Sequence, residues 1–201
     1  DYNVIDKNDD IKENRDKIII GTICNISPVK GLEILSYFGN SFSNIRNKIQ
    51  FVIIGAEYKN QSKYIKHLKS TIVDYSDFIQ FLGFKDDITQ VFDDIDIYFC
   101  SSNFESSPLA VWEAMAFGKP VVTFDVGDVK FYIKDFETGF VIPEQNYEYF
   151  VEKLTYLINN KTKRKKMGDE AHKTAIASFS PKLIATKTAK FYREVVNSEP
   201  T

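Results

Sequence analysis

Six short and almost continuously apolar runs, separated by segments with helical patterns, constrain the fold of this chain more than any other feature. The runs cover residues 18–23, 51–54, 79–82, 95–99, 121–124 and 139–142. Strands that are apolar on both faces are typical of parallel sheets covered by helices on either side. Because crossovers between parallel strands are right-handed, we expect an α/β fold with a doubly wound parallel sheet of about six strands.

Helical patterns fill the intervals between these runs and the last third of the chain. The predicted helices cover about residues 30–47, 61–71, 87–92, 108–117, 147–158 and 162–178. A final helix is expected to start at Pro181, with Ser180 as its N-cap. Residues 17–201 are therefore predicted to form one domain with helices on both faces of the sheet and a helical C-terminal tail.

The first 16 residues have a different composition from the rest of the chain. Residues 1–16 are polar and charged and show no apolar period, which is typical of a linker. The chain also starts at Asp1 and not at Met. We therefore expect a fragment, in which residues 1–16 are the linker from a missing N-terminal domain.

Charge and cysteine content favour a cytoplasmic protein. The formal net charge of −2 gives no indication of nucleic-acid binding, and no apolar run is long enough to span a membrane. Cys24 and Cys100 end apolar runs and belong to no CxxC pair, which favours reduced core cysteines. His67 and His172 occur in Lys-rich helical stretches, so we interpret them as surface residues and not as ligands.

The segment from Glu105 to Glu113 is the strongest candidate for a ligand site. Sheets of this kind bind ligands beyond the carboxyl ends of their strands, and this segment follows the fourth run. Ser106 and Ser107 are candidate N-caps, and Pro108 suits the first helical position. The free N–H groups of that first turn could bind an anion, and a carboxylate can accept two hydrogen bonds from a ribose diol.

The same segment carries the signature of a known family. Two glutamates with seven residues between them are followed by Glu113-Ala114-Met115, Gly118-Lys119-Pro120 and Thr138-Gly139-Phe140-Val141. Ser27-Pro28-Val29-Lys30-Gly31, Ile54-Gly55 and Phe81-Leu82-Gly83 precede them. Over roughly residues 17–143, the chain resembles the C-terminal, nucleotide-sugar-binding domain of glycosyltransferase family 4. These are retaining enzymes of the GT-B architecture, which has two Rossmann-like domains.

The resemblance implies a role for each site residue. Glu105 and Lys30 would be catalytic: Glu105 would contact hydroxyls of the donor sugar, and Lys30 would neutralise the leaving diphosphate. Glu113 would bind the ribose hydroxyls. The backbone would bind the phosphates around Ser106, Ser107 and Leu109, and the nucleobase near Leu82 and Phe84. The resemblance implies no metal and no cofactor other than the donor substrate.

Two positions depart from the family pattern, and two further features stay open. Asn25 stands where the family usually has an arginine, although it could still donate a hydrogen bond. Asp128 stands where a second glycine is frequent, and Lys130 could offset its charge. Asp125 is at least as readily a turn residue as a functional one. A basic cluster could contact acidic lipid, although a solvated helix start is favoured: it consists of Lys161, Lys163, Arg164, Lys165 and Lys166.

The predicted function is glycosyl transfer from a nucleotide-diphosphate sugar to a glycan or lipid-linked acceptor, in surface polysaccharide or lipopolysaccharide assembly. The acceptor would be bound through the missing N-terminal domain, so the chain alone would transfer little. The expected location is the cytoplasm or the inner face of the membrane. The alternative is a non-catalytic nucleotide-sugar-binding domain with a degenerate phosphate site. A nicotinamide-binding domain is disfavoured because no Gly-x-Gly-x-x-Gly turn follows the first run.

Overall fold

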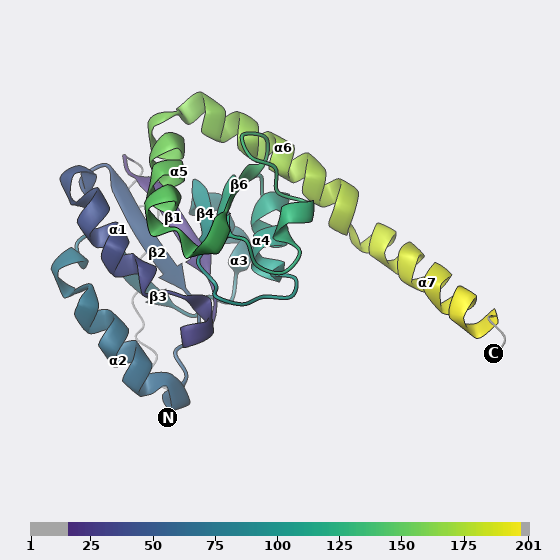
Figure 1. Ribbon diagram of the computed structural model, residues 1–201, viewed down its shortest axis with the longest axis horizontal. Coiled ribbons are helices and arrows are strands. Elements are labelled where there is room, and N and C mark those ends of the chain that lie inside the picture. Colours follow the sequence, from purple (N-terminus) through teal and green to yellow (C-terminus); the bar gives the residue numbers. More distant parts are fainter. Residues whose placement is uncertain (1–15, 198–201) are drawn as a thin grey trace.

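A parallel sheet of six strands forms the centre of the molecule (Figure 1). The computed structural model describes residues 16–197, so the predicted linker lies outside the described residues except for Asp16. The strands are β1 (Ile18–Ile23), β2 (Ile49–Ile54), β3 (Ile79–Gly83), β4 (Ile97–Cys100), β5 (Val121–Phe124) and β6 (Gly139–Ile142). Their order in the sheet is β3-β2-β1-β4-β5-β6. The chain thus winds outward from β1 and then from β4, which confirms the doubly wound α/β fold.

Seven α-helices are present in the described part of the chain. They are α1 (Ile34–Phe42), α2 (Ser62–Thr71), α3 (Ile88–Asp94), α4 (Leu109–Ala116), α5 (Tyr147–Asn159), α6 (Lys161–Phe179) and α7 (Pro181–Asn197). Helices α1, α2 and α5 lie on one side of the sheet, and α3, α4 and α6 lie on the other (Figure 1). The first helix is shorter than predicted, because Gly31 adopts a left-handed φ of 59° directly after a 3-10 turn at Pro28–Lys30.

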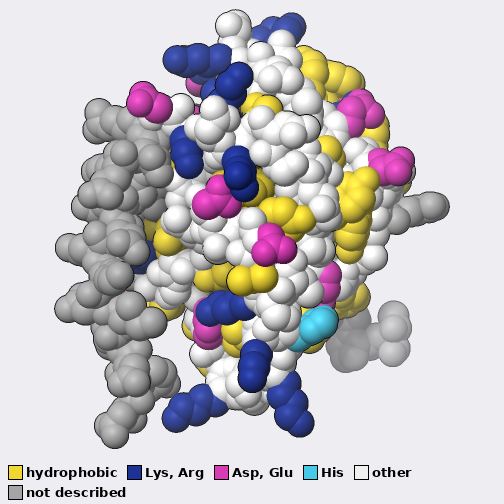
Figure 2. Space-filling model, turned by 90° about the vertical axis from the view of Figure 1, so that its left-hand side faces the viewer, with side chains coloured by type: hydrophobic (Ala, Val, Ile, Leu, Met, Phe, Trp, Pro, Cys, Tyr) yellow, Lys and Arg dark blue, Asp and Glu magenta, His cyan; other side chains and the backbone are white. Residues whose placement is uncertain are grey.

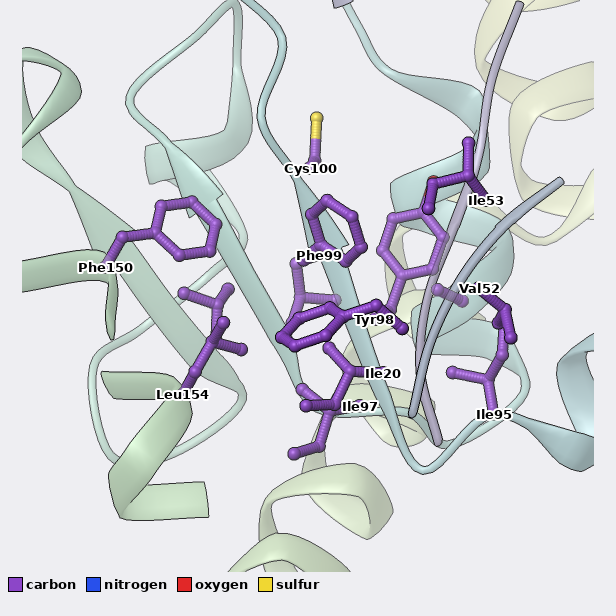
Figure 3. Packing of buried hydrophobic residues seen from close by; sticks show 14 of the residues in the cluster. Ile20, Val52, Ile53, Ile95, Ile97, Tyr98, Phe99, Cys100, Phe150 and Leu154 are labelled. Carbon is purple, nitrogen blue, oxygen red and sulfur yellow. The ribbon is translucent and has the colours of Figure 1, made fainter. Parts of the chain in front are cut away.

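Aromatic side chains of β4 alternate between the two layers. Phe99 lies on the side of the sheet that carries Phe150 of α5 (Figure 3). The ring centroid of Phe38 in α1 lies 5.7 Å from that of Phe99 and 5.6 Å from that of Phe150. Tyr98 points to the other face, with its ring 6.1 Å from that of Phe92 in α3. This alternation follows from the two-residue period of a strand, and it explains why β4 is apolar at every position.

The C-terminal tail begins as part of the core and ends outside it. Helix α6 packs on α4, and the ring centroids of Phe179 and Trp112 are 4.6 Å apart. Helix α7 has no buried residue and extends away from the body (Figure 1). Arg164 was predicted to belong to an exposed basic cluster, which is wrong. Its side chain is 9% exposed and donates to the Leu157 carbonyl over 2.7 Å, so it caps the end of α5.

The surface around α1 and α2 carries mixed charge. Figure 2 shows this side of the molecule, where Lys and Arg side chains are interspersed with Asp and Glu. This face therefore gives no indication of a patch that would bind a polyanion. Within residues 16–197, no helix has the length and apolar character needed to cross a membrane.

Candidate functional site

A cavity of about 420 Å³ opens at the carboxyl edge of the sheet. It extends across the loops that follow β1, β2, β3 and β4, which includes the switch point between β1 and β4. Backbone hydrogen bonds join these loops: the Cys24 N–H donates to the Ile54 carbonyl over 2.9 Å, and the Gly55 N–H donates to the Gly83 carbonyl over 2.8 Å. The cavity wall is therefore held by the main chain as well as by side chains, at the edge where such sheets bind ligands.

An ion pair between two distant loops lies on the cavity wall. Lys30 Nζ is 2.6 Å from Glu105 Oε1, and Ser102 Oγ donates to the same oxygen over 2.8 Å. The loops are fixed by a close approach, because Ser101 Oγ donates to the Lys30 carbonyl over 2.9 Å. A Cβ atom on Gly31 would lie only 2.1 Å from the Ser101 carbonyl oxygen. The two predicted catalytic side chains are thus brought together and line the same cavity.

The start of α4 differs from the prediction. Pro108 is the N-cap and Leu109 the first helical residue, and no side chain caps the helix. Ser107 does not cap α4, because its Oγ accepts a hydrogen bond of 3.0 Å from Trp112 Nε1. Ser106 uses its carbonyl to accept from the Asp128 N–H over 3.2 Å. The first N–H groups of α4 therefore have no side-chain cap, at an end of the helix where Ser107, Pro108 and Leu109 line the cavity.

Some of the other predicted site residues line the cavity, and the rest lie outside its wall. Asn25 and Phe84 line the cavity, and the Phe84 side chain is 68% exposed. Leu82, Ser106 and Glu113 do not line it. Glu113 lies one turn after Leu109 on α4. Its side chain is exposed, but the protein around the carboxyl partly desolvates it, which raises its pKa above the ordinary value.

The turn after β5 arranges its charges in another way than predicted. Lys130, which could have offset the charge of Asp128, instead pairs with Asp125, whose carboxylate lies 3.7 Å from Lys130 Nζ. Asp128 Oδ1 is buried and has no hydrogen-bond partner among the described residues. The turn nevertheless packs closely on the candidate site, since a Cβ atom on Gly127 would lie 2.3 Å from the Ser106 carbonyl oxygen.

The sequence analysis missed several residues of the cavity wall. Lys85, Tyr98 and Ser102 all line it. Ser102 holds Glu105, and the Tyr98 hydroxyl donates to the Ile23 carbonyl over 3.3 Å. Lys85 could have been predicted as a wall residue, because it follows a strand-ending glycine by two residues. Ser102 and Tyr98 could not have been predicted, because both look like ordinary strand or loop residues.

Both cysteines also line the cavity. Both are free thiols, as predicted: Cys100 is buried and Cys24 is half-buried. Burial raises the pKa of the Cys24 thiol to about 12, with a further contribution from the neighbouring Cys100. A thiol with this pKa stays protonated at neutral pH and is therefore a poor nucleophile. Among residues 16–197, no group of three or more His, Cys, Asp or Glu side chains is arranged to hold a metal ion.

Comparisons with known proteins agree with this geometry. The family model described as "Glycosyl transferases group 1" matches residues 4–174. The spore coat protein SA of Bacillus subtilis is 27% identical over 187 residues, which are 89% of this chain and 49% of that protein. The poly(ribitol-phosphate) alpha-N-acetylglucosaminyltransferase of Staphylococcus aureus is 26% identical over 171 residues, which are 84% of this chain and 34% of that protein.

A solved structure shares the fold over most of the chain. The crystal structure of Anabaena HepE in complex with UDP and glucose superposes with a TM-score of 0.82 at 22% identity, covering 93% of this chain and 52% of that one. The chain spans slightly less than half the length of the curated relatives that match about nine tenths of it. The family match covers most of the chain and includes the cavity, the Lys30–Glu105 pair and α4. This chain belongs to the glycosyl transferases group 1 family.

Proposed function

We propose that this chain is the donor-binding half of a retaining glycosyltransferase, which transfers a sugar from a nucleoside-diphosphate sugar to a glycan or lipid-linked acceptor. The observation that carries the proposal is the Lys30–Glu105 pair, which lies in one cavity with the uncapped start of α4. A cation and free N–H groups together match a diphosphate, and a carboxylate matches sugar hydroxyls. Residues 17–201 form the donor domain in this proposal.

The chemistry assigned to these groups follows the movement of charge. When the bond between the anomeric carbon and the diphosphate oxygen breaks, its electron pair goes to the diphosphate. Lys30 and the first N–H groups of α4 stabilise this negative charge. Glu105 accepts hydrogen bonds from sugar hydroxyls and holds the anomeric carbon toward the acceptor hydroxyl. In a retaining transfer, that hydroxyl forms the new bond on the face that the diphosphate leaves, and its proton passes to the departing diphosphate.

The remaining predicted residues receive binding roles. Glu113 accepts from the ribose hydroxyls beside the cavity, and the backbone around Leu82 and Phe84 contacts the base. The backbone at Ser106, Ser107 and Leu109 contacts the phosphates. Asn25 donates a hydrogen bond where it lines the wall. No metal is required in this proposal, because lysine supplies the positive charge.

The acceptor class rests on the relatives. The Staphylococcus aureus relative is named for transfer to poly(ribitol-phosphate), and a Rhizobium meliloti relative is named for lipopolysaccharide core biosynthesis. We place this chain by analogy in surface polysaccharide or lipopolysaccharide assembly, in the cytoplasm or at the inner face of the membrane. Since the relatives are about twice as long, acceptor binding is assigned to a separate N-terminal domain.

Calorimetric titration of the chain with UDP-, GDP- and ADP-sugars tests donor binding. Weak but measurable binding of one base class is expected, with little or no transfer by the 201 residues alone. Transfer by the complete enzyme, with and without Glu105→Ala, tests catalysis. Wild-type transfer in the Glu105→Ala enzyme would show that the role given to Glu105 is wrong.

The second candidate function is a non-catalytic nucleotide-sugar-binding domain. It is favoured by the uncharged Asn25 on the cavity wall and by the buried, unpartnered Asp128 Oδ1 beside the 105–107 segment. Donor binding without any transfer by the complete protein would support this candidate. If the chain binds none of the three classes of donor, both candidates are contradicted.

A further inference from the structure

The charged side chains on the cavity wall differ in whether they have an ion-pair partner. Among the described lining residues, the charged side chains are those of Lys30, Lys85 and Glu105. Lys30 and Glu105 neutralise each other across 2.6 Å. Lys85 makes no ion pair within residues 16–197, and it therefore gives the wall its net positive charge.

Lys85 is placed along the wall and not in open solvent. Its side chain is half-buried, whereas the next residues, Asp86 and Asp87, are exposed. Asp87 is occupied as the N-cap of α3, where its Oδ1 accepts from the Thr89 N–H over 2.9 Å. A lysine in this position keeps its stem against the protein and leaves its ammonium free to meet a ligand.

Main-chain hydrogen bonds fix the Lys85 loop relative to the loops that follow β1 and β2. Gly83, which precedes Phe84 and Lys85, accepts from the Gly55 N–H over 2.8 Å. The loop of Gly55 is in turn tied to the loop after β1, because the Ile26 N–H donates to the Ala56 carbonyl over 3.1 Å. Lys85 and Asn25 thus lie on loops held to the same β2 loop, and only Lys85 carries a charge.

We propose that Lys85 is a phosphate-binding residue of the donor site and that it determines the affinity of the cavity for a diphosphate. The inference rests on the proposed function, because it assigns this residue to the donor already placed in the cavity. A diphosphate carries several negative charges, and the Lys30 ammonium is already shared with Glu105. An ammonium has three donors and no acceptor, so an anionic oxygen is its preferred partner over a neutral base.

The test compares Lys85→Met and Lys85→Arg with Lys63→Met, a matched control. Lys63 is an exposed lysine of α2 that does not line the cavity. Each variant of the chain is titrated calorimetrically with inorganic pyrophosphate, which has no base, and with UDP, GDP and ADP. Lys85→Met is expected to lower the affinity for pyrophosphate and for the nucleotide that binds by about tenfold. Lys85→Arg and Lys63→Met are expected to lower it much less. The dependence of affinity on salt should also become shallower in Lys85→Met.

Three results would overturn the inference, and each has a different meaning. If Lys85→Met binds pyrophosphate and nucleotide as tightly as the unchanged chain, Lys85 is not a phosphate ligand, while the proposed function stands. If it weakens the nucleotide but not pyrophosphate, Lys85 contacts the base or ribose. If the unchanged chain binds none of the nucleotides, the proposed donor site itself fails. Thermal melting of each variant distinguishes lost binding from lost folding.

Discussion

Lys30 Nζ and Glu105 Oε1 lie 2.6 Å apart and form an ion pair between residues separated by 75 positions in sequence. The side chains are only 25% and 17% exposed. The carboxylate is therefore the internal partner of the cation that we assign to the diphosphate. A diphosphate that draws Lys30 away from Glu105 leaves the carboxylate free to accept from sugar hydroxyls.

Opposite changes in diphosphate affinity are expected when either member of this pair is neutralised. Lys30→Met should weaken binding of the preferred nucleoside diphosphate by roughly 10- to 100-fold, because a charge-assisted hydrogen bond is worth roughly 1.5–3 kcal/mol. Glu105→Gln should strengthen it, because Lys30 loses its internal partner. Calorimetric titration measures both. Equal weakening by both variants would indicate that the pair acts only as a structural link.

Glu113→Gln should raise the melting temperature at neutral pH. Partial desolvation raises the pKa of the Glu113 carboxyl, so the folded state binds its proton more tightly than the unfolded state. Folding stability therefore falls as the pH rises from the unfolded to the folded pKa, and the ionised carboxyl carries this cost above that range. The gain in Glu113→Gln should vanish at about pH 3, where the carboxyl is largely protonated in both states.

Thermal melts at both pH values measure this difference, with exposed Glu137→Gln as the control. The same Glu113→Gln variant should bind nucleotide more weakly if Glu113 accepts from the ribose. A lower melting temperature at pH 7 would mean that Glu113 makes a favourable contact in its ionised form.

Cys24 should react slowly with iodoacetamide in the folded chain. Burial raises its thiol pKa to about 12, so the reactive thiolate is scarce at pH 8. Alkylation at pH 8 is expected to be more than about 100-fold slower than in urea, and it should accelerate as pH rises toward 12. Mass spectrometry of the labelled peptide measures both rates. Rapid labelling of the folded chain would show that the thiol is ionised or freely accessible.

Gly127→Ala should destabilise the chain more than Gly83→Ala. Both glycines have left-handed φ values, 57° and 68°, which cost an alanine roughly 1–2 kcal/mol. A Cβ atom at Gly127 also meets the Ser106 carbonyl oxygen at 2.3 Å, whereas one at Gly83 meets no atom within 4 Å. Urea unfolding gives both free energies. Equal losses of unfolding free energy in the two variants would mean that the turn after β5 can shift to accommodate a Cβ atom at no energetic cost.

Chelation should leave donor affinity unchanged. The proposed site balances the diphosphate with Lys30, Lys85 and backbone N–H groups, so no divalent cation is needed. Titration of the nucleotide with and without EDTA should give the same dissociation constant, and added Mg²⁺ should not tighten it. Loss of binding in EDTA would require a metal in the site.

The alternating pattern of apolar runs and helical segments was enough to predict the sheet, because residue burial on both faces leaves a continuous apolar signal. The same pattern located β1, β5 and β6 within a residue. Helix ends were harder, because they depend on turn geometry. Gly31 follows the 3-10 turn with a left-handed φ of 59°, and the Ser101 carbonyl packs where a Cβ atom would lie. That contact joins two separate loops, so the local sequence around Gly31 does not show it.

The sequence alone thus predicted the fold, because it is encoded in local period, and its motifs carried the resemblance to a glycosyltransferase family. Only the tertiary structure decided which side chains meet. It paired Lys30 with Glu105, turned Arg164 inward to cap α5 and gave Lys130 to Asp125, and it left Lys85 on the cavity wall without an ion pair among residues 16–197. Such pairings join loops on separate strands, and their energies depend on distances and burial that no local pattern records.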